Sequence, residues 1–148
     1  MSEGTDSPRT LSTSIPAIPA PSAPSAPASR SDEDAKARIA ALEREARALG
    51  ASPQAAVLFH EVGRLWEHPL RHPRNAAVAY QSAFKLAPAF VANIRSARRL
   101  FGEVGNWVMV VQLLDAELKV LPDGSRARPA LLHEKALVLE QRLSREAD

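Results

Sequence analysis

The chain has 148 residues, enough for one domain or for one domain with a tail. It contains no cysteine, which excludes disulfides, thiolate metal sites and a cysteine nucleophile and fits a reducing compartment. The formal net charge is +2, and no stretch approaches the ~18 consecutive apolar residues of a membrane span. The N-terminus also lacks the basic start and apolar run of a signal peptide. We therefore expect a cytoplasmic protein without a membrane segment.

Residues 1–30 form a segment rich in proline, serine and alanine. Half of the 12 prolines lie here, and aromatic residues are absent. Proline lacks an amide donor, and so little apolar surface cannot offset the entropy lost on ordering the chain. We predict a disordered tail over residues 1–30.

A capping helix is predicted over residues 31–50. Ser31 is followed by three acids, which is typical of a helix N-terminus because carboxylates favour the positive end of the helix dipole. Apolar residues then recur every three or four positions, and Gly50 suits the end of the helix.

Five more helices are expected, at about 53–67, 75–87, 90–101, 106–121 and 129–143. Ser52 followed by proline is a strong start signal, two His-Pro pairs break the chain near residue 70, and Pro88 and Pro122 each end a helix. No stretch alternates with the period of a strand, so the sequence predicts an all-α fold.

Internal repetition suggests how these helices are arranged. Pro88 and Pro122 are 34 residues apart, and small and aromatic residues recur at matching positions before them. The residues that carry the pattern are Phe59, Val62, Gly63, Trp66, Ala76, Tyr80, Ala83, Ile94, Ala97, Phe101, Gly105, Asn106, Trp107, Val110 and Leu114. In period and in residue types this resembles the tetratricopeptide repeat (TPR) family. The resemblance implies a solenoid of antiparallel helix pairs over 52–148, with repeats at about 52–88 and 89–122 and an incomplete third at 123–148.

Two residues depart from the family pattern. Arg98 and Glu117 stand where small residues usually allow paired helices to approach each other. We expect both to weaken the packing of the second repeat.

The resemblance also implies a function. TPR proteins usually bind a peptide segment along the concave surface formed by the first helix of each pair. By the alignment, the side chains of this surface are His60, Arg64, Glu67, Arg95, Arg99 and Glu103. Its three arginines would form a basic strip, so the expected ligand is an acidic peptide of a protein partner.

No catalytic set emerges from the sequence. His60, His68 and His72 lie near one another, but they lack a metal-binding motif, and no phosphate-cradling loop or nucleophile motif is present. We expect a non-enzymatic scaffold without cofactor or metal. The alternative is an RNA-binding helical repeat, which the excess of arginine would suit. The small net charge and the assignment of the aromatics to the core argue against nucleic acid.

The last helix begins a repeat that the sequence does not complete. Its apolar residues are Leu131, Leu132, Leu137, Val138, Leu139 and Leu143. Terminal repeats normally carry a polar outer face. We therefore expect an exposed apolar face that drives self-association, or a chain that is a fragment of a longer repeat protein.

Overall fold

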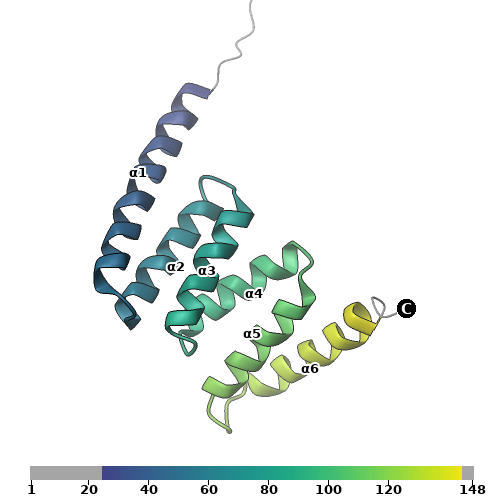
Figure 1. Ribbon diagram of the computed structural model, residues 1–148. Coiled ribbons are helices and arrows are strands. Elements are labelled where there is room, and N and C mark those ends of the chain that lie inside the picture. The colour runs from purple at the N-terminus through teal and green to yellow at the C-terminus, as the bar shows by residue number, and fades with distance from the viewer. Residues whose placement is uncertain (1–24, 145–148) are drawn as a thin grey trace, which may run out of the picture.

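The computed structural model describes the backbone of residues 25–144 and the side chains of residues 30–144. The described part consists of helices joined by turns and has no strand (Figure 1), which confirms the all-α prediction. The helices are α1 (Ser25–Leu49), α2 (Pro53–Glu67), α3 (Pro73–Leu86), α4 (Val91–Glu103), α5 (Trp107–Val120) and α6 (Arg128–Val138). A π-helical turn, η1 (Leu139–Leu143), continues α6. Residues 1–24, most of the predicted tail, and 145–148, the end of the predicted incomplete repeat, lie outside the described residues.

The first helix starts earlier than predicted. It begins at Ser25, so Ser31 and the acids after it lie inside α1 and do not cap it. The extension contains Pro27, which a helix tolerates in its first turn because the amides there have no intrahelical partner. The boundary between tail and helix at residue 30 is therefore wrong by about one and a half turns.

The other helix ends follow local chemistry. The Ser52 hydroxyl accepts a hydrogen bond from the Ala55 amide at 3.2 Å, and the Asn106 side chain accepts one from the Met109 amide at 3.1 Å. Gly50 has a φ of 65°, the left-handed conformation that commonly ends a helix. These contacts confirm the predicted starts of α2 and α5 and the predicted end of α1.

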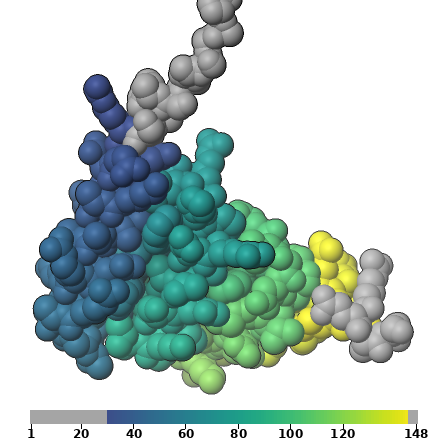
Figure 2. Space-filling view, turned by 45° about the horizontal axis from the view of Figure 1, so that its top comes forward, coloured from purple at the N-terminus to yellow at the C-terminus, as the bar shows by residue number. Residues whose placement is uncertain are grey.

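Each helix packs against the next one in the chain, from α1 to α6. In Figure 1 the helices follow one another across the molecule, and Figure 2 shows α1 and α6 at opposite ends of it. No helix among the described residues is both long enough and apolar enough to cross a membrane.

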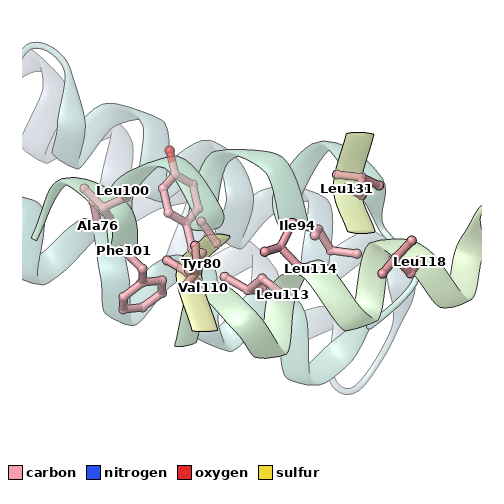
Figure 3. Packing of buried hydrophobic residues seen from close by; sticks show 12 residues of the cluster. Ala76, Tyr80, Ile94, Leu100, Phe101, Val110, Leu113, Leu114, Leu118 and Leu131 are labelled. Carbon is pink, nitrogen blue, oxygen red and sulfur yellow. The ribbon is translucent and has the colours of Figure 1, made fainter. Parts of the chain in front are cut away.

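Two clusters of buried side chains form the core. The larger joins α3, α4, α5 and α6 (Figure 3), and the smaller joins α1, α2 and α3. Trp66 is half-buried and packs against both clusters. Tyr80 is completely buried, and its ring lies so close to Gly63 that a Cβ at that glycine would overlap it. The small residue at position 63 is therefore needed for α2 and α3 to approach each other.

Candidate functional site

The residues predicted to bind a ligand lie on α2 and α4. A polar hollow of about 330 Å³ opens between these helices, against Tyr80 of α3. Of the predicted residues, it brings together Arg64, Glu67 and Arg99. The other lining residues are Glu61, Leu65, His68 and Ser96. A second hollow of about 320 Å³ adjoins it, because the two share Glu67, His68 and Arg99. The second adds Arg71, Pro73, Leu100 and the predicted Glu103.

A buried carboxylate, Glu67, forms the wall that the hollows share. Arg99 donates to both of its oxygens, at 2.8 Å and 3.0 Å, and the Tyr80 hydroxyl donates to one of them. The Glu67 side chain is only 7% exposed. Burial alone would raise the pKa of this carboxyl, but the hydrogen bonds from Arg99 and Tyr80 hold the pKa below its usual value. The same burial and the same contact with Glu67 raise the pKa of Tyr80. Glu67 and Arg99 thus form an ion pair, to which the Tyr80 hydroxyl adds a third hydrogen bond, and together the three residues join α2, α3 and α4.

His60 is half-buried, contacts other side chains of the protein and lines neither hollow. Its Nδ1 lies 3.1 Å from Oδ1 of Asn93, and its ring packs between those of Tyr80 and Phe90. Asn93 is fully buried and donates to the backbone carbonyl of Tyr80. Burial lowers the pKa of His60, against the opposing effect of the Asn93 hydrogen bond. His60 therefore links α2 to α4 as a structural group.

Arg95 also has a partner within the protein. It donates to Glu117 of α5 at 2.7 Å, and Arg98 donates to the other oxygen of the same carboxylate at 2.8 Å. Glu117 is 1% exposed, and Arg98 further reaches Glu134 of α6 at 3.8 Å. Arg98 and Glu117, the two residues that depart from the repeat pattern, thus form an ion pair. The opposite charge of each partner offsets the cost of burying the other, in addition to the effect on packing that the pattern predicts.

The predicted basic strip is corrected by these contacts. Arg95 and Arg99 are both bound to carboxylates that other helices supply. Arg64 is the least constrained of the three, since its side chain is 64% exposed and its ion-pair partner, Glu61, lies at 3.4 Å. Glu103 is 61% exposed and lies 3.4 Å from Arg99. The sequence could not reveal these pairings, because the partners are 22 and 32 residues apart and meet only through packing.

Arg71 is the one arginine of the hollows that the repeat alignment did not assign to the binding surface. Arg71 lines the second hollow with a φ of 56°, in the left-handed region that non-glycine residues seldom adopt. It lies in the turn between α2 and α3, where the two His-Pro pairs predict a break in the helix but no ligand-binding residue. Within the described residues, no three histidine, aspartate or glutamate side chains gather closely enough to hold a metal ion.

Comparisons with family models, with curated proteins and with solved structures found no match to this chain.

Proposed function

We propose that this chain is a non-catalytic scaffold of the TPR kind, in the cytoplasm, that binds a peptide segment of a protein partner across α2 and α4. The observation that carries the proposal is the pair of adjoining hollows. They are open, and they share a wall in which Glu67 accepts hydrogen bonds from Arg99 and Tyr80. A wall whose hydrogen bonds are already satisfied offers a pre-formed surface, which lowers the entropic cost of binding.

The packing is consistent with a solenoid of helix pairs. Neighbouring helices contact each other in chain order, and the small residues of the repeat pattern are buried at the contacts. Ala76 and Ala83 are both completely buried, and Gly63 lies against the Tyr80 ring. Small residues at these positions let two helices approach closely, as stacked pairs require.

Over both hollows three arginines face three glutamates, so the lining has no net charge. The cations that an acidic ligand would use are the two arginines that no buried carboxylate binds. Arg64 lines the first hollow and Arg71 the second, and both are exposed. The left-handed backbone of Arg71 costs on the order of 1 kcal/mol, and such strain is often found at binding sites. Because Glu67 already neutralises Arg99, the peptide's carboxylates would pair with Arg64 and Arg71.

The test is peptide binding followed by fluorescence anisotropy. We would screen fluorescein-labelled peptides with acidic, neutral or basic residues at each position. Acidic peptides should bind best, and Arg64→Glu should weaken the best of them by about tenfold or more. Arg44→Glu is the matched control, since Arg44 is exposed on α1 and lines neither hollow. Equal losses in both variants, or no binding by any peptide class, would refute the proposal.

Arg71→Gly separates binding from folding. Glycine adopts a positive φ without strain, so this variant should be at least as stable as the wild type. It also removes the cation, so peptide affinity should fall by about threefold to tenfold. A variant that is more stable but binds less tightly would show that the cation at this position serves binding.

RNA remains the alternative ligand and has less support. Arg95, Arg98 and Arg99 are each paired with a carboxylate, so three of the arginines that suggested RNA are already neutralised. Labelled single-stranded RNA in the same assay distinguishes the two. Tight, salt-dependent RNA binding that Arg64→Glu abolishes would favour the alternative.

A further inference from the structure

A hollow lined by aromatic residues lies among α1, α2 and α3. Its volume is about 210 Å³, and it shares no lining residue with the two hollows of the candidate site. Its large apolar residues are Phe59 and Trp66 of α2, both half-buried, and Val78 of α3, which is 63% exposed. The other lining residues are Glu43, Asn75, Ala79 and Ser82. We call this the aromatic hollow. Aromatic-lined grooves are typical of sites that bind extended, proline-rich segments.

The chain itself contains a proline-rich segment with apolar side chains. The segment Ile15–Pro19 belongs to residues 1–24, outside the described residues, and its two isoleucines are the only large apolar residues between Leu11 and α1. Proline-rich sequences favour the polyproline II conformation, which has three residues per turn. In that conformation Ile15 and Ile18 lie on the same edge of the segment, about 9 Å apart.

The spacing of the two isoleucines matches that of the two aromatic residues. Phe59 and Trp66 are seven residues apart, which is two turns of α2 and about 10 Å along its axis. A segment in the polyproline II conformation that lies along the aromatic hollow therefore places Ile15 against Phe59 and Ile18 against Trp66.

The attachment of this segment to α1 lets it reach the aromatic hollow. α1 runs beside α2 and begins on the side of the turn between α2 and α3 (Figure 1). Glu43, which lines the hollow, is 18 residues after Ser25, or about 27 Å along α1. Ile15 precedes Ser25 by ten residues, which span about 31 Å in the polyproline II conformation. An attached segment acts at an effective concentration on the order of 1 mM, so even a weak contact can be populated.

We propose that Ile15–Pro19 docks in the aromatic hollow of its own chain and runs back along α1, with Ile15 against Phe59 and Ile18 against Trp66. The docked segment covers Val78 and fixes the proline-rich tail to the first three helices. Residues 10–24 carry no charged side chain, so the contact is apolar. Docking should therefore change little with salt concentration, unlike the binding of an acidic peptide.

The test is paramagnetic relaxation enhancement in the full chain. The sequence has no cysteine, so a nitroxide attached to Ser14→Cys is the only label. The oxidised nitroxide should reduce the amide signals of Val78 and Ser82, relative to the reduced sample. The signal of Leu132 should not change, because α6 lies at the other end of the molecule from α1 (Figure 2).

A mixed sample distinguishes docking within one chain from docking between two. Labelled chain without ¹⁵N is mixed with unlabelled, ¹⁵N-enriched chain, so that only contacts between copies reduce the observed signals. The signals of Val78 and Ser82 should stay at full intensity in this sample. A loss of intensity here as large as in the labelled chain would assign the contact to a second copy and overturn the proposal.

Charge substitutions on both sides of the contact test which residues make it. Ile18→Asp and Val78→Asp should each abolish the loss of signal at Ser82, because a carboxylate would be buried against apolar side chains. The matched controls should keep that loss. They are Ala23→Asp, two residues before α1 and unable to reach the hollow, and Val108→Asp, 54% exposed on α5 and outside the hollow. No loss of signal in the parent labelled chain, a loss that survives Ile18→Asp, or one that the controls also abolish would overturn the proposal.

Discussion

Gly63 shows how a single residue sets the distance between two helices. The Tyr80 ring occupies the space that a side chain at position 63 would need. Gly102, near the end of α4, is also helical, but a Cβ there would meet nothing nearer than a Trp107 ring carbon at 3.9 Å. The chain thus offers two helical glycines with opposite surroundings.

We predict opposite effects of alanine at these two glycines. Gly63→Ala should lower the free energy of unfolding by about 1–3 kcal/mol, because the added methyl overlaps a fully buried ring. Gly102→Ala should raise it by up to about 1 kcal/mol, since alanine favours a helix and the space is open. Urea unfolding of both variants checks this. Equal effects would mean that Tyr80 does not lie against Gly63 in solution.

At the scale of helices, an ion cluster holds α4, α5 and α6 together. Glu117 of α5 is almost completely buried, Arg98 of α4 is 20% exposed, and Glu134 of α6 is 46% exposed. Removing one partner of a buried pair leaves the other charge uncompensated, whereas removing both is far less costly. The cluster therefore makes a double-mutant cycle informative.

We predict strong coupling between Arg98 and Glu117. Glu117→Ala should lower the free energy of unfolding by about 3 kcal/mol. Arg98→Ala should lower it by less, because Arg95 still donates a hydrogen bond to Glu117. The double variant, which restores the small residues of the repeat pattern, should be more stable than the sum predicts by about 1–3 kcal/mol. Arg95→Ala is the comparison and should cost less, because the Arg95 side chain is 56% exposed. Additive losses in the urea unfolding cycle would count against the cluster.

The helices were predictable to the extent that their signals are local. Ser52, Gly50 and Asn106 act within three or four residues of themselves, so their spacing in the sequence was sufficient. The start of α1 was misplaced because Ser31 and its acids form a good capping signal that the structure does not use. The helix instead begins at Ser25, in a segment with Pro27 and two serines in which no local signal predicted a helix.

The candidate site was predictable only in its position. The repeat pattern placed Arg64, Glu67 and Arg99 on neighbouring helices, and the structure brings these three together. The ion pairs of these arginines could not be predicted, because the carboxylates that bind Arg99 and Arg95 lie on other helices. Arg98 and Glu117 were recognised as departures from the repeat pattern. Their ion pair was not predicted, because the sequence does not show which residues of different helices come into contact.

At the scale of the whole molecule, two titratable side chains of α2, His60 and Glu67, bond this helix to α3 and α4. His60 joins α2 to α4 through Asn93, and Glu67 joins α2 to α3 and α4 through Tyr80 and Arg99. Protonation of Glu67 removes the negative charge that binds Arg99, and protonation of His60 places a charge in a half-buried position. Global stability should therefore depend on pH in two separate windows.

The upper window belongs to His60. Burial lowers its pKa in the folded protein, whereas in the unfolded chain it titrates near 6.5. Between these two values the unfolded chain binds more protons, so the free energy of unfolding should fall as the pH drops below about 6.5. The lower window belongs to Glu67, whose folded pKa is also lowered. Its contribution is complete above the usual glutamate value of about 4.3 and is lost as the pH falls through the folded pKa.

The measurement is urea unfolding at closely spaced pH values from about 7 down to about 3, which covers both windows. The wild type should lose stability in two steps. His60→Gln should be less stable than the wild type at pH 7, because the packing of the ring is lost, yet its stability should change less between pH 7 and pH 5. The step below about pH 4.3 should remain in that variant, because Glu67, Tyr80 and Arg99 are unchanged. Glu67→Gln should show the reverse, losing the lower step and keeping the upper one. An upper step of the same size in His60→Gln would assign that titration to a different group.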